Sequence, residues 1–355
     1  MEIYVLDELN GIIGLVDVFE SVIWNVQYFS RNDFQLQIAG TAENVELLQM
    51  GRLLCRAEDI SETDYKNVMR IEGIKLDFDS ESGWLLTITG KGLKNTLSRR
   101  IVWNQTTITG NVEAAIRQVI TENVINPDDS DRQIPNFTLG RPKGFEDTAD
   151  IQLLGDNIAE WIEATCQTYG YGWDVYISNG KYVFDLYTGT DRSYDQSDVD
   201  PVVFSPEYDN LLTSTYIYDK EGYNNAALIG GEGEGINKRT ASVGTSAGLE
   251  RLETYIDGSG VSSNGKIITE AQYLKMLEDF GQETLSEEAY TTTFEGKVDP
   301  HSTYELNRDY FLGDIVQVDN NNGIAAVTRI IEIIYAEDIN GSSVVPTFTD
   351  WEVNE

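Results

Sequence analysis

The stretch YVLDELNGIIGLVDVF, residues 4–19, places Asn10 and Gly11 between two apolar runs. Asn-Gly pairs favour the type I′ turn of a β-hairpin, because both central residues of that turn need a positive φ. Residues 34–38, FQLQI, then alternate apolar and polar side chains, as a half-buried strand requires. The chain therefore begins as an antiparallel β-meander, and we expect a small β-barrel or twisted sheet over roughly its first ninety residues.

Helical patterns follow this β segment. Residues 148–169 place apolar side chains at helical spacing and predict the strongest amphipathic helix of the chain. A second Asn-Gly pair, Asn179 and Gly180, predicts another hairpin directly after it. Residues 268–290 predict a long helix, and the apolar runs before and after it predict further strands.

The order of these elements indicates the fold class. Meander, helices, strands, helix and strands again fit an α+β protein and lack the regular βαβ alternation of a doubly wound fold. We expect a β-rich α+β chain with two small β-barrel-like domains and mixed helical segments between them. The expected domains are a β-barrel-like domain at 1–95, a helix-rich α+β domain with a hairpin at 96–200, and a β-rich domain with one long helix at 201–355.

The charge balance of the chain excludes several partners. Its 355 residues include 25 Lys and Arg against 60 Asp and Glu, which gives a net charge of -35. Sequence-specific nucleic-acid binding would work against this field, because such proteins neutralise phosphates with basic side chains. No apolar run reaches the roughly eighteen residues of a membrane span, and the acidic N-terminus lacks the basic region of a signal peptide. We therefore expect no membrane partner and synthesis in a cytoplasm.

Cysteine and histidine are scarce. Cys55 and Cys166 lie far apart without a CxxC pattern, which predicts two buried, reduced thiols rather than a disulfide or a zinc site. His301 is the single histidine, so multi-histidine metal sites are excluded. It stands in a polar, Pro-containing turn, where a surface position is expected.

Two segments carry residue types found in ligand sites. Residues 230–239, GGEGEGINKR, lack the GK[ST] ending of a phosphate loop and place Glu232 and Glu234 where phosphate would bind, which predicts a glycine-rich turn between strands. Five aspartates fall between Asp191 and Asp209, without the central Gly and closing Glu of a helix-loop-helix calcium site. A solvated loop is the expectation there, and an irregular calcium site stays open.

Neither the acidic nor the aromatic residues of the sequence identify a catalytic site. Sixty acids guarantee pairs at the spacing used for glycoside hydrolysis, but nothing in the sequence selects two of them. Trp161, Tyr171, Trp173 and Tyr176 could form a sugar platform, yet their spacing favours core packing. We therefore predict no catalytic, metal or cofactor site.

Several segments together resemble the siphovirus ReqiPepy-type tail protein family. The segments are YVFDLYTGTDRSYDQSDVDPVVFSPEYDNL at 182–211, YNNAALIGGEGEG at 223–235, GLERLETYIDGSG at 248–260, NRDYFLGDIVQV at 307–318, GRLLCRAED at 51–59 and GIKLDFDSESGWLLTITGKGLKNTLSRRIV at 73–102. The resemblance spans most of the chain, and the array is more specific than any one segment.

This resemblance implies a phage or prophage virion protein of the tail tip, assembled in the cytoplasm of the bacterial host. It implies a baseplate or distal tail hub, usually a homotrimer, that closes the tail tube and carries the spike, fibre or lysin. A structural role without enzyme activity or cofactor follows. Gly189, Asp191, Arg192 and Phe204 match a structural signature of the family, and we expect Asp191 and Arg192 to hold a loop through a local ion pair.

A chain of this charge needs complementary patches wherever its copies meet. The candidate basic side of such an interface is Arg99, Arg100, Lys238 and Arg239. Two other functions stay open: a cell-wall-degrading enzyme, and a carbohydrate-binding adhesion module of the tail tip, with or without calcium. Loss of lytic activity on changing an acid of the 191–209 run would indicate the enzyme, and stabilisation by calcium would indicate the adhesion module.

Overall fold

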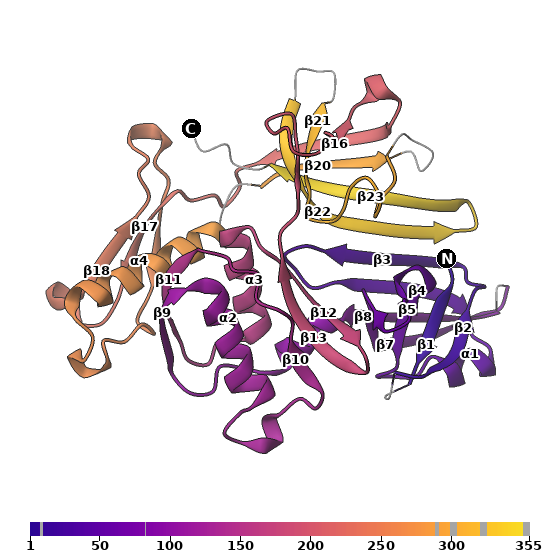
Figure 1. Ribbon diagram of the computed structural model, residues 1–355, viewed down its shortest axis with the longest axis horizontal. Helices are drawn as coiled ribbons and strands as arrows, with labels where there is room; N and C mark the ends of the chain where they lie inside the picture. The colour runs from indigo at the N-terminus through magenta and orange to yellow at the C-terminus, as the bar shows by residue number, and fades with distance from the viewer. Residues whose placement is uncertain (8–9, 82, 288–290, 299–303, 320–324, 351–355) are drawn as a thin grey trace. The chain divides into compact units, whose positions relative to one another are not determined.

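A computed structural model describes residues 1–7, 10–81, 83–287, 291–298, 304–319 and 325–350 (Figure 1). The chain divides into two compact units, each built from segments that are not consecutive. Unit 1 comprises Met1–Thr96, Gly172–Ile217 and Thr292–Glu355, and unit 2 comprises Leu97–Tyr171 and Tyr218–Thr291. The first boundary falls next to the expected one at residue 95, whereas the later segments alternate between the units.

Unit 1 is built on a 14-stranded sheet, counted over the described residues. The main path of the sheet, from edge to edge, is β16 (Leu211–Asp219), β20 (Thr291–Val298), β23 (Gly341–Asp350), β22 (Ala325–Asp338), β3 (Ser21–Gln27), β4 (Asp33–Ala39), β8 (Gly83–Gly92), β7 (Met69–Asp79), β5 (Leu53–Arg56), β1 (Ile3–Leu6) and β2 (Ile12–Val16). Off this path lie β14 (Asp191–Arg192), β15 (Val203–Phe204) and β21 (Ile315–Asp319). Unit 1 also holds α1 (Ala42–Leu47), β6 (Asp64–Tyr65), β12 (Gly172–Ser178) and β13 (Lys181–Tyr187).

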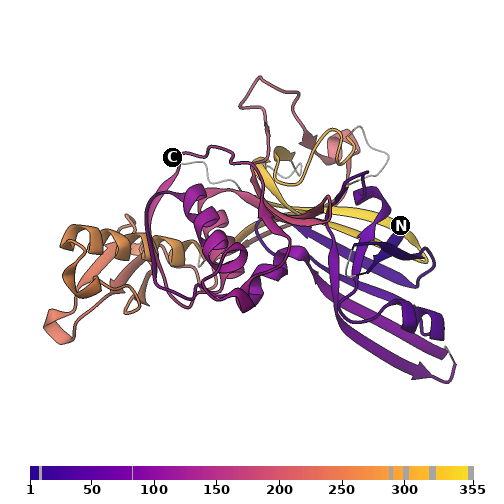
Figure 2. The same cartoon turned by 60° about the horizontal axis from the view of Figure 1, so that its bottom comes forward.

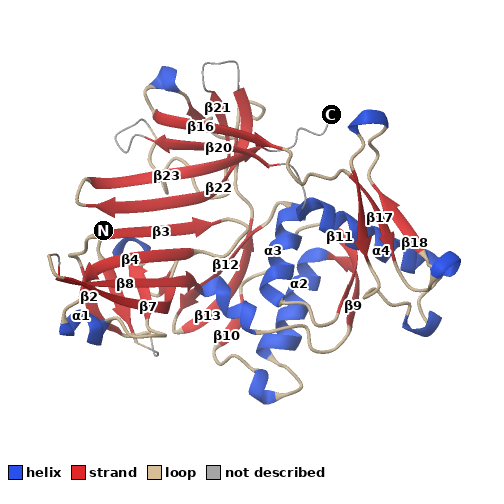
Figure 3. Cartoon of the chain, turned by 180° about the vertical axis from the view of Figure 1, so that it is seen from behind, coloured by secondary structure: helices blue, strands red, loops and turns tan. Residues whose placement is uncertain are grey.

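The first and last segments of the chain share this one sheet. Strand β22 lies beside β3 (Figure 3). The two strands pair antiparallel, and Tyr335 stands opposite Trp24. One core cluster lies under the N-terminal strands around Trp24, Leu36 and Ile88, and a second lies around Phe204 and the strands β21 to β23. The β-rich α+β class is thus confirmed. The two separate β-barrels are not, because the strands of both segments join into a single sheet that does not close among the described residues.

The two Asn-Gly pairs both lie in hairpins, but only one makes the expected turn. Asn179 and Gly180 both have positive φ, at 48° and 73°, and join β12 to β13 as a type I′ turn requires. Strands β1 and β2 also form a hairpin, but Leu6 pairs with Ile12, so its loop is longer than two residues. The side chain of Asp7 accepts a hydrogen bond from the N–H of Gly11 at 2.8 Å and stabilises this longer loop.

Within its described residues, unit 2 combines three further strands, three helices and a three-stranded sheet. Its elements are β9 (Thr106–Asn111), α2 (Val112–Ile120), a π turn at Thr121–Ile125, β10 (Phe137–Leu139), β11 (Thr148–Leu153), α3 (Ile158–Tyr169), β17 (Ala226–Gly230), β18 (Thr240–Val243), β19 (Glu253–Asp257) and α4 (Glu270–Glu287). Strand β17 pairs antiparallel with β18 and parallel with β19, and α4 packs its buried Tyr273 and Leu277 in one core cluster with that sheet. The described residues of both units also contain short 3-10 turns, at Ala57–Asp59, Leu93–Arg99, Ser130–Arg132, Pro206–Tyr208, Gly235–Asn237, Gly248–Glu250 and Asn264–Lys266.

The helix predicted at residues 148–169 is present only in its second half. Residues 148–153 form strand β11, which pairs antiparallel with β9. Gly155 has a φ of 85°, and the side chain of Asn157 accepts from the N–H groups of Ala159 and Glu160, so the helix begins at Ile158. Cys55 and Cys166 are both buried and form no disulfide, which confirms the prediction of two core thiols.

Candidate functional site

The four signature residues lie where the segment from Gly189 to Phe204 runs along β21. Strand β14 pairs parallel with β21, with Arg192 opposite Val316. Strand β15 also pairs parallel with β21, with Phe204 opposite Val318. The connection between β13 and β16 is therefore fixed at both of its ends to the C-terminal part of unit 1.

Gly189 is required by a close backbone approach. A Cβ atom at this position would lie 1.8 Å from the carbonyl oxygen of Gly313, a distance that no side chain tolerates. Gly313 itself has a φ of 94°, and a Cβ there would lie 2.2 Å from the ring of Tyr28. Three segments distant in sequence therefore approach one another at this point of unit 1.

Arg192 forms a largely buried ion pair with Asp314. Its Nε donates to Oδ2 of Asp314 at 2.7 Å, and the carboxylate also accepts from the backbone N–H groups of Thr190 and Phe311. The local pair expected between Asp191 and Arg192 is wrong. Successive residues of a strand point to opposite faces, so the two side chains diverge, and Asp191 accepts instead from the N–H of Ser193 at 2.8 Å.

Phe204 is a core residue. It is fully buried, and its ring lies 5.2 Å from that of Tyr310 and 5.4 Å from that of Phe348. Its role in unit 1 is to anchor β15 in the C-terminal core cluster.

The aspartate run forms a loop with its own hydrogen bonds. All five of its aspartates are exposed to solvent. The Gln196 side chain accepts from the N–H groups of Asp198 and Val199 and donates to the carbonyl of Ser193, and these hydrogen bonds fix the loop. Over the described residues, no three His, Cys, Asp or Glu side chains come together as a metal site would need. His301 lies outside the described residues.

The glycine-rich segment is the predicted turn between strands. It joins β17 to β18, where Gly230 pairs with Thr240. Glu232 points back into unit 2, where its carboxylate accepts from the N–H of Ser263 at 2.7 Å and pairs with Arg239. Arg239 also pairs with Glu270 at 3.0 Å.

The candidate basic residues are engaged within their own unit. The Arg239 guanidinium lies 3.8 Å from the ring centre of Tyr273 in addition to its two carboxylate partners. Arg100 donates to the carbonyl of Arg132 at 2.6 Å, and burial lowers its pKa. Lys238 is half-buried over Tyr255, whereas Arg99 is exposed at the end of its 3-10 turn. A basic interface formed by the four stays a prediction.

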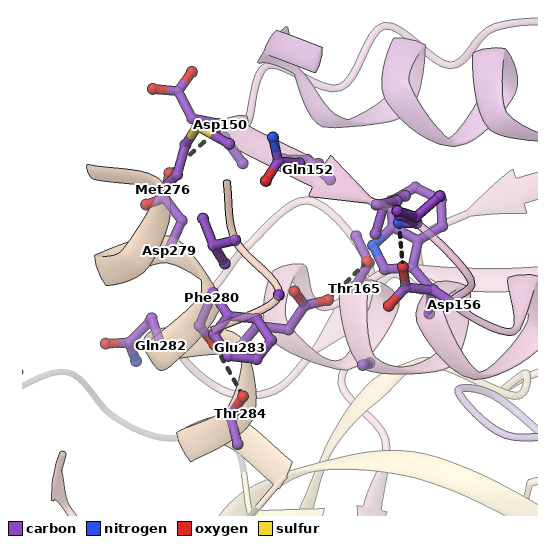
Figure 4. Close-up of a pocket in the computed structure, with 18 of the residues that line it drawn as sticks. Asp150, Gln152, Asp156, Thr165, Met276, Asp279, Phe280, Gln282, Glu283 and Thr284 are labelled. Carbon is purple, nitrogen blue, oxygen red and sulfur yellow. Dashed lines mark hydrogen bonds between the residues drawn. The ribbon is translucent and has the colours of Figure 1, made fainter. Parts of the chain in front are cut away.

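A pocket in unit 2 was not predicted. It has a volume of about 690 Å³ and lies between β11, α3, α4 and the loop after β19 (Figure 4). Hydrogen bonds tie its walls together. Thr165 on α3 donates to Glu283 on α4 at 3.3 Å, the N–H of Asp150 donates to Asp279 at 3.0 Å, and the side chain of Gln152 donates to the carbonyl of Ser262.

The lining of this unit 2 pocket is acidic and partly aromatic. Among the described residues that line it there is no Lys, Arg or His, and six are carboxylates: Asp150, Asp156, Glu160, Asp257, Asp279 and Glu283. Burial, reinforced by nearby carboxylates, raises the pKa of Tyr169 to about 12. The sequence offered one signal, the helical spacing that places Trp161 and Thr165 on one helix. The buried Trp161, Tyr171 and Trp173 confirm core packing for those three aromatics.

Comparison with known proteins identifies related folds. The sequence model of the family described as Siphovirus ReqiPepy6 Gp37-like protein matches residues 2–349. A search of curated protein sequences finds no significant match. Within the described residues, no helix combines the length and apolar character needed to cross a membrane.

Three solved structures share the fold over nearly their full lengths. A tail protein from Neisseria meningitidis is 14% identical with a TM-score of 0.59, over 98% of this chain and 96% of that one. The 43 kDa tail protein of prophage MuSo2 from Shewanella oneidensis is 13% identical with a TM-score of 0.60, over 98% of both chains. Prophage tail protein gp18 from Listeria monocytogenes is 11% identical with a TM-score of 0.54, over 100% and 96%. At these identities the likeness shows a common fold.

Proposed function

The chain belongs to the Siphovirus ReqiPepy6 Gp37-like protein family, and from that membership we propose that it is a hub of the distal tail or baseplate. In this role it closes the tail tube and connects it to the spike, fibre or lysin. The role is structural rather than enzymatic, and its place is the tail tip of the virion, after assembly in the cytoplasm of the host. Its partners are further copies of itself, a tube or distal tail protein, and the spike, fibre or lysin protein.

The family match and the fold support this proposal from two directions. The match covers residues 2–349, so both units belong to the family module. The fold recurs in tail proteins of prophages from Shewanella and Listeria over nearly the whole of each chain. One fold can serve different roles in different proteins, so support for the assembly role comes from the exposed side chains of this chain.

The observation that carries the assembly role is the apolar face of the β7–β8 hairpin. Ile74, Leu76 and Phe78 alternate along β7, and Phe78 lies opposite Trp84 of β8 with ring centres 4.9 Å apart. The exposed fractions of the side chains are 41% for Ile74, 44% for Leu76, 61% for Phe78 and 52% for Trp84. An apolar patch of this kind on a protein surface marks an interaction site.

This apolar face lies on the same side of the sheet as the buried core residues of unit 1 and continues from them into solvent. Leu76 lies opposite Leu86, which is fully buried, so one row of side chains passes from core to solvent. Strand β5 pairs with β7 only at Met69 and Arg70, and no strand within the described residues pairs with the edge from Ile74 to Asp79. Figure 2 shows the long β7–β8 hairpin extending past its neighbouring strands. An open edge with an apolar face suits pairing with another subunit.

The net charge suits such an assembly in one respect and opposes it in another. At -35, the chain repels DNA, so a passage built from it would let DNA pass without binding. The same charge makes copies repel one another, and salt screens that repulsion. A ring held together by apolar faces should therefore form more readily as salt rises.

Light scattering on the purified full chain tests the proposal. The mass is measured at low and at moderate salt, with and without calcium. A trimer promoted by salt supports the hub. A monomer under every condition, together with lytic activity on cell walls or glycan binding that calcium strengthens, would replace the hub by the enzyme or the adhesion module.

A further inference from the structure

The side chains of Arg100 and Arg132 lie close together in unit 2. Nε of Arg100 donates to the carbonyl of Arg132 at 2.6 Å, and Nη2 of Arg132 donates to the carbonyl of Ile101 at 2.8 Å. Burial and the positive charges of Arg132 and Arg99 lower the pKa of Arg100, as neighbouring like charges do. Backbone carbonyls thus hold two guanidinium groups near each other.

Both guanidinium groups keep N–H donors that a ligand can use. Arg100 uses Nε and Nη1 for the carbonyls of Arg132 and Arg99, and Arg132 uses Nη2 for Ile101 and Asn123. A guanidinium group carries more donors than these bonds occupy. Among the described residues, neither Arg100 nor Arg132 forms an ion pair with a carboxylate. The remaining donors are of the kind that bind a carboxylate through two parallel hydrogen bonds.

Trp103 places an apolar surface next to these charges. It is 61% exposed, and the guanidinium of Arg132 lies 4.9 Å from the centre of its ring. Its backbone N–H donates at 3.1 Å to Oδ1 of the buried Asn123, the oxygen that also accepts from Arg132. Trp and Arg dominate the hot spots of protein interfaces. Arg100, Arg132 and Trp103 therefore form one preorganised surface, which we name the Arg–Trp platform.

The acids nearest in sequence do not occupy this platform. Asp128 accepts from the side chain of Asn104 at 3.0 Å, and Asp129 accepts from the N–H of Asp131 at 3.0 Å. Their charges weaken the local positive field but leave the free donors of the two arginines in place. In a chain of net charge -35, the partner that such donors select is acidic, and a second copy of the chain has that character.

The aspartate loop of unit 1 has the complementary composition. The carboxylates of Asp195, Asp198 and Asp200 are exposed and accept no hydrogen bond from the described residues. Tyr194, next to them in sequence, is 59% exposed. Hydrogen bonds of the Gln196 side chain already fix the loop, so binding costs little further ordering. Acids and an aromatic ring on this loop thus match the arginines and the aromatic ring of the platform.

We propose that the Arg–Trp platform of one copy binds the aspartate loop, residues 194–200, of a second copy of this chain. Arg100 and Arg132 pair with carboxylates of the loop, and Trp103 packs against Tyr194. Each copy carries the platform on unit 2 and the loop on unit 1, so it offers both halves of a head-to-tail contact, as a ring requires. The inference rests on the proposed function and adds to the apolar hairpin a contact whose charges fix which surfaces meet.

Disulfide trapping between two full-length variants tests this contact. One variant carries Asn104→Cys next to Trp103, the other carries Ser197→Cys in the loop, and both positions are exposed. The native cysteines are buried and do not compete. Under mild oxidation at moderate salt, we expect the mixed cross-link to form at least tenfold faster than one between Ser197→Cys and Ser242→Cys, an exposed position on β18.

Reversing the charges of the loop shows whether the arginines select it. Asp195→Lys with Asp198→Lys, added to the loop variant, should slow the mixed cross-link at least tenfold, because like charges then meet at the platform. Glu43→Lys with Glu46→Lys, at exposed positions of α1, changes the net charge by the same amount and should not slow it. All four substitutions lie at the surface, so the fold is expected to survive them.

Reversing the platform as well should restore the contact. Arg100→Glu with Arg132→Glu, paired with the reversed loop, should return the rate of cross-linking to within about threefold of the original pair. Circular dichroism checks that this platform variant folds, since both side chains hold backbone carbonyls. If it does not fold, the reversed loop and its α1 control decide the question without it.

Two results would overturn the proposal. The first is a mixed cross-link that forms no faster than the Ser242→Cys control. The second is a cross-link whose rate is unchanged by Asp195→Lys with Asp198→Lys. Failure of this contact is distinguishable from failure of the hub: a salt-promoted trimer in light scattering without the cross-link supports the hub and overturns the contact. The cross-link without a trimer supports the contact and contradicts the ring.

Discussion

Nε of Arg192 lies 2.7 Å from Oδ2 of Asp314, and the two side chains are only 17% and 3% exposed. The two residues are 122 positions apart in the sequence. Their pair fastens the segment after β13 to the loop before β21, and the same carboxylate accepts from two backbone N–H groups. One buried carboxylate thus satisfies three donors.

Removing this carboxylate should cost unit 1 a large part of its stability. Asp314→Ala leaves the Arg192 charge and the N–H groups of Thr190 and Phe311 without their acceptor, and we expect the free energy of unfolding to fall by about 3 kcal/mol. Denaturant titration measures the change. The exposed pair of Lys75 and Asp77 provides the control, because Asp77→Ala should cost less than about 1 kcal/mol. If Asp314→Ala and Asp77→Ala lose the same free energy of unfolding, the buried ion pair of Asp314 contributes no more to stability than an exposed one.

Gly189 offers a test that involves no charge. In Gly189→Ala the added methyl group would meet the carbonyl of Gly313, and backbone on both sides has to shift. We expect a loss of about 3 kcal/mol or more. Gly260→Ala is the matched control, since a Cβ there meets nothing within 4 Å, and it should stay within about 0.5 kcal/mol of the wild type. A melting temperature of Gly189→Ala equal to that of the control would contradict the close approach.

The periodicity of apolar residues in the sequence predicts single strands and helices of this fold, but not how they pair. Alternation in residues 34–38 identified β4, and helical spacing identified α3 and α4, because each pattern reports the buried face of one element. It does not report the neighbour of that element. The pairing of β3 with β22 therefore could not be predicted, and two barrels were expected where one sheet joins both ends of the chain.

The same limit applies to the sites. Strand alternation makes Asp191 and Arg192 face opposite ways, but the sequence predicted a loop at this position, so the short strand β14 that separates the two side chains became visible only in the structure. The true partner, Asp314, could not have been chosen among sixty acids. The unit 2 pocket is hidden for a similar reason: its acids come from separate segments, and only folding brings Asp150 next to Asp279.

The hairpin face gives a prediction about assembly. Replacing Phe78 and Trp84 together by Ser removes the two most exposed rings of that face, and we expect the assembled fraction in light scattering to fall at least tenfold at moderate salt. Because both rings are more than half exposed, the melting temperature should change little.

A matched variant lies on the opposite face of the same hairpin. Lys75→Ser with Asp77→Ser keeps the net charge and removes only an exposed ion pair, so its assembly should equal that of the wild type. If the two double variants assemble alike, the apolar face is not the contact between subunits.

The raised pKa of Tyr169 predicts how stability changes in alkaline solution. An ordinary Tyr in the unfolded chain loses its proton near pH 10, whereas burial and nearby carboxylates raise the pKa of Tyr169 in the folded chain to about 12. Between these values the folded state holds the proton more tightly than the unfolded state. Its contribution to stability is therefore complete below pH 10 and is lost as pH rises towards 12, by up to about 1.4 kcal/mol per pH unit.

Tyr169→Phe removes this group while keeping the ring. Denaturant titrations of the wild type and Tyr169→Phe from pH 8 to pH 11 should give parallel stabilities below about pH 9 and a shallower alkaline decline in the variant. Other buried tyrosines, among them Tyr310, also have a raised pKa, so both proteins should still lose stability. Identical alkaline slopes would show that Tyr169 titrates as an exposed phenol, and would contradict the raised pKa that burial and the nearby carboxylates give it.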